Sequence, residues 1–315
     1  MTLTNEAKTA VALTTRLGSR ERPSLTPKMW HELGRALRDS GHRPVDVFDE
    51  SLDLSSVPGI SEDLHDRIRR LTSDAGSAML EVDELSHRGI WTTTIFDDEY
   101  PHGLIERLGH NAPPVLFGSG NVGLLANPGI GIVGSRDVAD EGAEVAKALA
   151  REAVSLGMSV VSGAAKGVDQ LAMNAAFNDR GTVVGVLADS LVGRIRRPET
   201  LQALDEGVVC LLTQQAPSSG FTPAGAMARN KIVYALSAIT AVVASDEGSG
   251  GTWSGATEAL KAGNGIVAVW RGPGEGPGNE ALEKAGAVPI RVASEIADLL
   301  KADATSEQMS LDWAQ

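Results

Sequence analysis

Three short loops rich in glycine and serine carry the residue types that bind a phosphate group. The first is Gly134-Ser135-Arg136, which follows an apolar run starting at Ile130 and precedes a long helical pattern. The others are Ser162-Gly163-Ala164 and the segment 245–252. A turn at a helix start offers free backbone N–H groups, to which a hydroxyl and a guanidinium add donors. We therefore predict an anion-binding site centred on Gly134 to Arg136.

These loops follow strands of a predicted α/β domain. Apolar or β-branched runs alternate with helical patterns after Ile130, at residues 159–161, 182–187, 208–212, 239–244, 266–270 and 288–292. Such a pattern is typical of a parallel sheet covered by helices on both faces. The predicted fold class is therefore α/β, with a doubly wound, mostly parallel sheet. Its ligand site is expected outside the carboxyl ends of the strands, where the three loops converge.

The helix after the first loop is predicted to lie close against this sheet. Its apolar or small residues recur at steps of four and three, at Gly142, Ala146, Leu149, Ala153 and Leu156. This spacing places them on one face of a helix, and Gly157 is a stop signal.

The region before the α/β domain is predicted to be helical. Helices are expected over 25–37 and 61–71, joined through Val57-Pro58-Gly59-Ile60, before a strand at 91–96. A Pro-Gly turn followed by an Arg-rich helix is similar to a helix-hairpin-helix module, whose N–H groups face a nucleic-acid phosphate. A plain turn between helices explains the same residues. The predicted domains are a helical domain at 1–85, a larger domain at 86–300 and a tail at 301–315.

Composition excludes some classes of function. The chain has 315 residues and a formal net charge of −13. It contains one cysteine, Cys210, so neither a disulfide framework nor a cysteine-based metal site is expected. All six histidines precede residue 111, which leaves the loops of the α/β domain without a histidine base or ligand. With no leader-like or membrane-spanning stretch, a cytoplasmic location is expected. No cofactor, metal or catalytic residue is predicted.

Two nucleotide-binding motifs fit poorly. In Gly129-x-Gly131-x-x-Gly134 the first two glycines come before and within the strand rather than in the turn, which disfavours a dinucleotide site. Lys166 and Thr252 lack the context of a Walker motif. Asp169 could be a lone carboxylate near the site, but we favour a role in anchoring its loop.

Several motifs in one order resemble the DprA/Smf family of DNA-processing proteins, as a divergent member. The resemblance spans about residues 90–290, and its specific parts are Tyr100-Pro101, Pro114-Val115-Leu116-Phe117, Ile132 to Arg136, Val160 to Asp169, Ala228 to Ser237 and Ser249 to Thr252. It implies an extended Rossmann-like domain after a small all-α domain of the SAM or helix-hairpin-helix type. It also implies binding of single-stranded DNA without base specificity, transfer of that DNA to RecA in recombination or natural transformation, and a homodimer.

The resemblance also assigns the binding residues. The expected DNA- and phosphate-binding set is Gly134, Ser135, Arg136, Ser162, Gly163, Lys166, Arg229, Asn230, Lys231, Ser249, Gly250, Gly251 and Thr252. Residues 229–231 match the family's Arg-Asn-Arg stretch; by themselves they suit either a nucleic-acid backbone or a solvated helix start.

An alternative function stays open. The wider superfamily contains small-nucleotide sensors and phosphoribohydrolases, and Gly250-Gly251-Thr252 followed by Glu258 is similar to their signature. In that case Glu258 would perform the chemistry.

The tail carries a possible docking motif. Residues 301–307 are polar and expected to be flexible. The following Gln308-Met309-Ser310-Leu311-Asp312-Trp313 is similar to the hexapeptide that binds the replication sliding clamp. Gln308 would fill a polar spot, and Leu311 and Trp313 an apolar pocket; packing of the tail on its own domain is the other interpretation.

Overall fold

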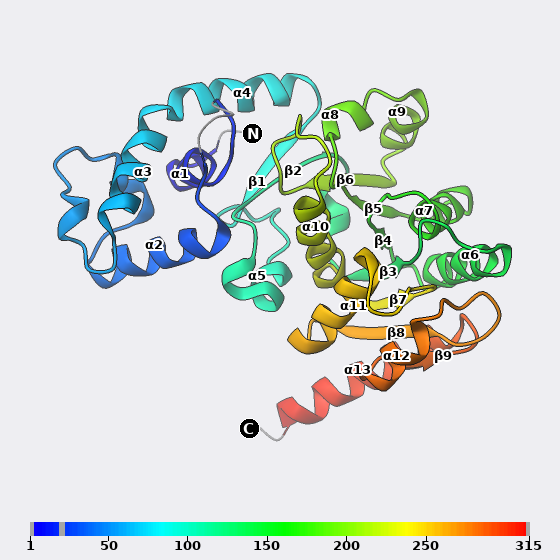
Figure 1. Ribbon diagram of the computed structural model, residues 1–315. Helices are drawn as coiled ribbons and strands as arrows, with labels where there is room; N and C mark the ends of the chain where they lie inside the picture. The colour runs from blue at the N-terminus through cyan, green and yellow to red at the C-terminus, as the bar shows by residue number, and fades with distance from the viewer. Residues whose placement is uncertain (1–2, 19–22, 313–315) are drawn as a thin grey trace. The chain divides into compact units, whose positions relative to one another are not determined.

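The computed structural model describes residues 3–18 and 23–312. The chain forms two compact units (Figure 1). Unit 1 comprises residues up to Ser119 together with Leu212–Ser219, and unit 2 comprises Gly120–Leu211 and the chain from Gly220 onward. The boundary between these units falls after the first two strands, and the predicted domain bounds near residue 86 stay a prediction.

Unit 1 combines helices with one strand pair. Its helices are α1 (Asn5–Thr14), α2 (Pro27–Asp39), η1 (Pro44–Phe48), η2 (Leu54–Ser56), α3 (Glu62–Ser73), α4 (Ala75–His87), α5 (Gly103–Leu108) and η3 (Gly109–Asn111). Strands β1 (Trp91–Thr94) and β2 (Val115–Gly120) pair antiparallel, with Trp91 opposite Gly118. The hydroxyls of Thr26 and Ser61 cap α2 and α3 by accepting backbone N–H groups, which explains where these predicted helices begin.

The arginines of α3 stabilise unit 1 from within. Arg67 donates to the carbonyls of Pro23 and Ser24, and Arg69 donates to Leu52 O at 2.6 Å. Two arginines of the predicted Arg-rich helix are therefore engaged by the unit's own backbone. This arrangement favours the plain-turn interpretation over a helix-hairpin-helix site.

Unit 2 is built on a parallel sheet. Its strands are β3 (Gly129–Val133), β4 (Val160–Ser162), β5 (Val183–Val186), β6 (Val209–Thr213), β7 (Ser237–Val242), β8 (Ile266–Trp270) and β9 (Val288–Ile290). Their order is β6-β5-β4-β3-β7-β8-β9. Every registered pair among β3, β4, β5, β7, β8 and β9 is parallel. Each predicted apolar run overlaps one of these strands, and the chain reverses its direction of winding between β3 and β7.

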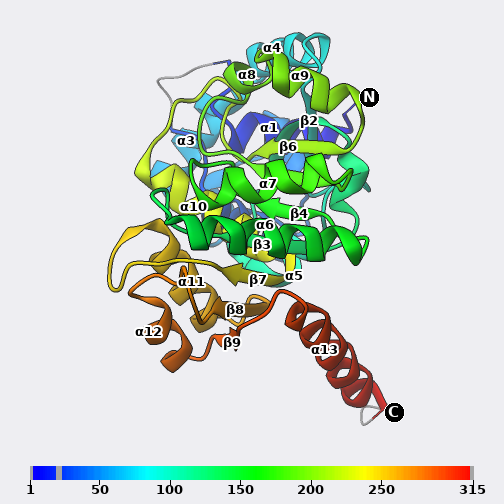
Figure 2. The ribbon, with the colours of Figure 1, turned by 90° about the vertical axis from the view of Figure 1, so that its right-hand side faces the viewer.

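Helices cover both faces of this sheet. The helices of unit 2 are η4 (Val122–Leu125), α6 (Asp140–Ser155), α7 (Val168–Asn178), α8 (Leu191–Arg194), α9 (Pro198–Asp205), α10 (Pro223–Ala235), α11 (Gly250–Ala262), α12 (Asn279–Lys284) and α13 (Glu295–Asp312). Helices α6 and α7 lie against one face, and α10 and α11 against the other (Figures 1 and 2). The predicted doubly wound arrangement is confirmed.

The buried face of α6 follows the predicted pattern with one correction. Gly142, Ala146, Leu149 and Ala153 are buried, but Leu156 is 36% exposed. The helix ends at Ser155, and Leu156 is its C-cap residue.

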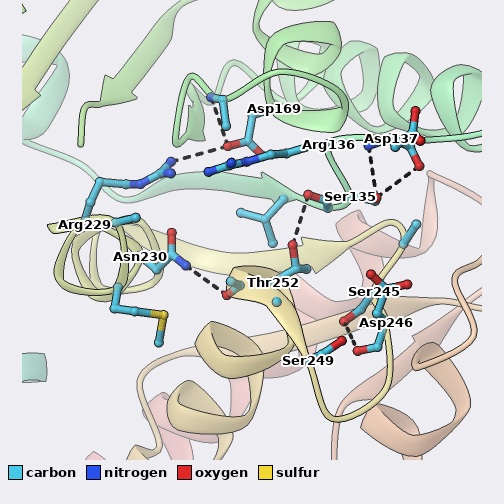
Figure 3. A pocket seen from close by; sticks show the side chains of 18 of the residues that line it. Ser135, Arg136, Asp137, Asp169, Arg229, Asn230, Ser245, Asp246, Ser249 and Thr252 are labelled. Carbon is cyan, nitrogen blue, oxygen red and sulfur yellow. Dashed lines mark hydrogen bonds and ion pairs between the residues drawn. The ribbon is translucent and has the colours of Figure 1, made fainter. Parts of the chain in front are cut away.

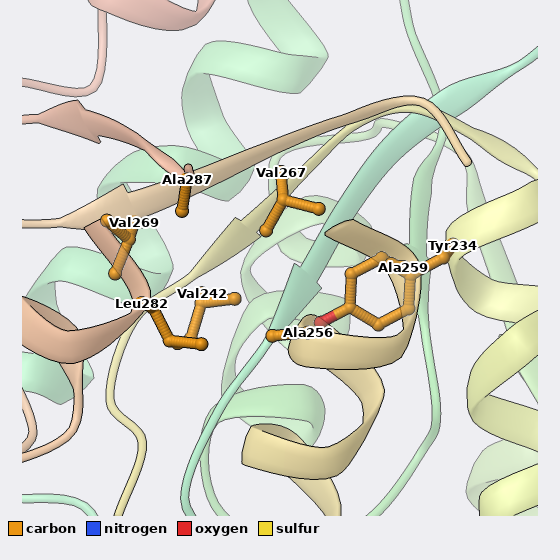
Figure 4. Packing of buried hydrophobic residues seen from close by; sticks show 8 residues of the cluster. All are labelled: Tyr234, Val242, Ala256, Ala259, Val267, Val269, Leu282 and Ala287. Carbon is orange, nitrogen blue, oxygen red and sulfur yellow. The ribbon is translucent and has the colours of Figure 1, made fainter. Parts of the chain in front are cut away.

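The second face has a core of small and branched side chains. Aliphatic residues of β7 and β8 pack there against alanines of α11, a leucine of α12 and the ring of Tyr234 from α10 (Figure 4). The fully buried members of this cluster are Val242, Ala256, Val269 and Leu282. Alanines on α11 let the helix approach the sheet closely, which positions its first turn.

The predicted tail begins within the last helix of the described chain, and its flexibility stays a prediction. The backbone from Lys301 to Asp312 continues helix α13. Trp313 lies outside the described residues, as do the side chains of Gln308 and Leu311, so the docking motif stays a prediction. Within the part of the chain that the structure describes, no helix is long and apolar enough to cross a bilayer.

Candidate anion-binding site

A cavity of about 440 Å³ lies outside the carboxyl ends of β3 and β7, where the sequence predicted a site (Figure 3). It is lined by residues of the loops after β3, β4 and β7, by residues along α10 and by the first turn of α11. Nine predicted residues line it: Gly134, Ser135, Arg136, Arg229, Asn230, Ser249, Gly250, Gly251 and Thr252. Ser162, Gly163, Lys166 and Lys231 do not.

The loop after β3 is held from both sides. A Cβ on Gly134 would lie 2.6 Å from a methyl group of Val168, so only glycine fits there. Thr252 donates its hydroxyl to Gly134 O at 3.0 Å, which ties the start of α11 to this loop. Thr252 therefore positions the loop, and its hydroxyl proton is not available to a phosphate.

Ser135 and Arg136 differ in what they can offer a ligand. The Ser135 hydroxyl donates to Asp137 O and accepts from Asp137 N, both at 3.1 Å, so its proton is engaged. Arg136 is exposed, and its guanidinium carbon lies 5.5 Å from the centroid of the exposed Phe221 ring. No carboxylate within the described ranges forms an ion pair with Arg136. Its guanidinium can therefore take up an anion.

The first turn of α11 provides the backbone donors. This helix has 13 residues, its N-cap Ser249 makes no side-chain capping bond, and Gly250 has a φ of +81°. The first N–H groups of a helix lack partners inside the helix, and its dipole favours a negative charge. Because Ser249 to Thr252 all line the cavity, this turn is a ready anion site next to Arg136.

A buried ion pair supports the wall of the cavity. Arg229 Nη1 lies 3.4 Å from Asp169 Oδ2, and both side chains are 8% exposed. Burial raises the pKa of Asp169, and the neighbouring guanidinium acts in the opposite direction. Burial lowers the pKa of Arg229, which Asp169 partly offsets. Asp169 also accepts Ala165 N at 3.4 Å, so it anchors the loop after β4, as the favoured interpretation expected.

Two of the predicted phosphate ligands, Ser162 and Gly163, are buried and have structural roles. Ser162 is fully buried and donates to Ile132 O at 2.6 Å, which joins the ends of β4 and β3. Gly163 is buried too, and a Cβ on it would overlap the Arg229 guanidinium. Gly163 is therefore required for the ion pair, and direct phosphate binding by these two buried residues stays a prediction.

Of the remaining predicted residues, Asn230 lines the cavity, whereas Lys231 and Lys166 lie outside its lining. Asn230 donates its amide to Gly251 O at 3.0 Å, so it fixes the α11 turn. Lys231 pairs with Glu258 at 2.8 Å, and Lys166 is exposed, both outside the cavity lining. Glu258, the acting carboxylate of the alternative function, is thus engaged with a lysine and does not line the cavity.

Sequence reasoning missed several residues here. Phe221, 51% exposed, lines the cavity from the irregular segment before α10, and no periodicity marked it. Asn279 is fully buried and donates to Val243 O and Trp270 O, each at 2.8 Å, while accepting Ser245 N at 2.9 Å. It therefore fixes the loop after β7, and the only signal was its place in a glycine-rich stretch.

The fold and site define a class of protein: a doubly wound α/β domain with a cavity at its topological switch point. Comparison with known proteins then identifies the family. A model described as DNA recombination-mediator protein A matches residues 91–301. The chain belongs to this family of DprA/Smf DNA-processing proteins, and the predicted resemblance is confirmed.

Individual relatives agree with this assignment. The chain is 32% identical over 185 residues to DNA processing protein DprA of Bacillus subtilis, covering 58% of this chain and 61% of that protein. It is 38% identical over 102 residues to DprA of Streptococcus pneumoniae, covering 31% and 34% of the two chains. These alignments thus span less than two thirds of either relative.

Solved structures of relatives share the fold. The crystal structure of DprA from Streptococcus pneumoniae matches with a TM-score of 0.66 at 22% identity, over 95% of this chain and 98% of that one. DprA from Helicobacter pylori, whose structure is described in terms of its single-stranded DNA binding mode, matches with a TM-score of 0.54 at 24% identity, over 67% of this chain and 96% of that one. The predicted extended Rossmann-like fold is confirmed.

Proposed function

We propose that this chain binds single-stranded DNA by its backbone at the cavity of Figure 3 and passes the strand to RecA. The observation that carries the proposal is the meeting of the α11 first turn, the Arg136 guanidinium and the exposed Phe221 ring in one cavity. Backbone N–H groups and a guanidinium bind a phosphate, and an exposed ring can stack on an unpaired base. Family membership and the Helicobacter pylori relative support this function.

The chemistry favours binding over catalysis. The described lining residues of the cavity include neither histidine nor cysteine, and the one deeply buried carboxylate, Asp169, is paired with Arg229. The hydrogen bonds from Asn230 to Gly251 O and from Thr252 to Gly134 O keep the backbone N–H groups of the first α11 turn in place. A preorganised anion site of this kind holds a strand without reading its bases, because its contacts go to the phosphate.

The test is fluorescence anisotropy with labelled oligo-dT of graded lengths at two salt concentrations. We expect affinity to rise with strand length and to fall with salt. Arg136→Ala should weaken binding about tenfold and lower the slope of log affinity against log salt by about 0.7. Phe221→Ala should lower affinity by about 1–3 kcal/mol through lost stacking. Arg151→Ala is the matched control, since this exposed arginine lies on α6 outside the cavity lining.

Two results would count against the proposal. Unchanged affinity of Arg136→Ala would show that the strand binds elsewhere. Full displacement by a mononucleotide, with no dependence on strand length, would favour the small-nucleotide alternative.

The partners are proposed separately. Transfer to RecA and homodimer formation follow from the family resemblance and are tested by co-sedimentation with RecA on single-stranded DNA and by light scattering. Clamp binding through Gln308, Leu311 and Trp313 depends on the sequence motif alone.

A further inference from the structure

Unit 1 contains a hollow of its own, of about 270 Å³. It is formed by one face of α2, the connection from α2 to η1, the residues after β1, and the corner between α5 and η3. All of its lining residues belong to unit 1. Nothing in the proposed function uses this hollow.

The hollow is lined by basic side chains, although the chain as a whole is acidic. Five basic side chains line it, namely His31, Arg38, His42, Arg43 and His110, and its described lining contains no acidic residue. The whole chain carries a net charge of −13. Such a local excess of donors in an acidic protein selects an anion.

Some of these groups already have partners, and others do not. Arg43 pairs with Glu6 at 3.3 Å, and His42 Nδ1 lies 3.9 Å from Asp46. Arg38, by contrast, is exposed in the last turn of α2 and forms no ion pair with any described residue. The rings of His31 and His110 approach one another, with centroids 6.4 Å apart. Arg38 and these two rings can donate to one incoming phosphate.

An aromatic surface accompanies the charges. Phe96 is 39% exposed and packs edge-to-face on the buried Trp30, with centroids 6.3 Å apart and an interplanar angle of 78°. Trp30 thereby holds the Phe96 ring in place. A supported, half-exposed ring is a suitable platform for a nucleobase.

From this combination we propose that unit 1 carries a second binding site, for one nucleoside phosphate. The phosphate contacts Arg38 and the paired histidines, and the base packs on Phe96. The hollow lies near the lower end of the size range of ligand cavities, which suits one nucleotide unit better than a peptide segment. The nucleotide is either free or one unit of a DNA strand.

The experiment is ultraviolet cross-linking of the full chain to an oligonucleotide carrying 5-iododeoxyuridine, with the modified peptides mapped by mass spectrometry. We expect cross-links within residues 27–44 or 95–112. Arg38→Ala should reduce their yield about threefold or more at subsaturating strand, because an exposed charge contact is lost. Arg35→Ala is the matched control, since this exposed arginine lies on the same helix outside the hollow.

A second arm identifies the source of the nucleotide. Cross-linking by free 5-iododeoxyuridine monophosphate at the same residues shows a mononucleotide site, and cross-linking by the strand alone shows a DNA subsite. Absence of cross-links in both segments with both probes overturns the proposal, as does equal loss in Arg38→Ala and Arg35→Ala. Arg136→Ala distinguishes the two sites, because it should leave the cross-links of unit 1 in place while weakening those at the cavity of unit 2.

Discussion

The ion pair between Asp169 and Arg229 makes a quantitative prediction about stability. Its atoms lie 3.4 Å apart and both side chains are 8% exposed, so each charge is poorly hydrated if the other is removed. At an effective dielectric constant of about 20, the attraction at this distance amounts to about 5 kcal/mol. Removing the carboxylate alone, in Asp169→Ala, should therefore cost about 3–5 kcal/mol of unfolding free energy.

The double variant distinguishes the electrostatic cause from lost packing. In Asp169→Ala with Arg229→Met no charge remains buried, so its cost should fall short of the sum of the single variants by about 2–3 kcal/mol. The measurement is urea denaturation followed by far-ultraviolet circular dichroism for the parent, both single variants and the double variant.

A second pair in the same chain provides the control. Arg151 and Asp179 also lie 3.4 Å apart, but their side chains are 58% and 43% exposed. The same cycle on this pair should show a coupling below about 1 kcal/mol. If the two couplings were equal, burial would not be the source of the effect and the reasoning would be refuted.

Three further changes test how the site is held together and what the tail does. Gly163→Ala should destabilise the parent strongly, because its methyl group would overlap the Arg229 guanidinium. In an Arg229→Ala background the same change should cost far less stability. An equal loss of thermal stability in the two backgrounds would contradict this account. Asn279→Ala should lower the unfolding free energy by about 3 kcal/mol or more, because it leaves buried backbone groups such as Ser245 N without a hydrogen-bond partner. It should also accelerate hydrogen exchange of the loop after β7, and unchanged exchange would exclude the positioning role. Deletion of residues 308–315 should abolish binding to a purified sliding clamp in surface plasmon resonance while leaving DNA affinity unchanged, and retained clamp binding would eliminate the tail motif.

Much of the parallel sheet could be predicted because its signals are local. The strand at Ile266–Trp270 was predicted with the bounds that the structure shows, since an apolar run between glycines has few alternatives. The loops after β3 and β7 could be placed together without knowing any contact, because carboxyl ends of parallel strands share one edge. The order of several motifs along the chain predicted the family.

Which residues of the site line the cavity and which are buried in the protein could not be predicted in the same way. Ser162 and Ser135 look alike in sequence, yet one is buried against Ile132 O and the other lines the cavity. Arg229 was expected to contact DNA directly, and its burial beside Asp169 depends on α7 and α10 packing around Gly163. Whether a polar side chain faces a ligand or another part of the protein is a long-range property.

The sequence by itself therefore determined the fold class and the edge of the sheet at which the cavity lies, and it predicted phosphate binding by the loops there. These follow from periodicity and from the backbone chemistry of glycine-rich turns, both of which act over a few residues. Only the tertiary structure decided that Arg136 and the first turn of α11 remain open to a ligand, whereas Ser162, Gly163 and Thr252 hold the cavity together. The physical reason is that hydrogen-bond partners and burial are set by segments that meet only after folding, such as Thr252 and Gly134, which are separated by 118 residues in the chain.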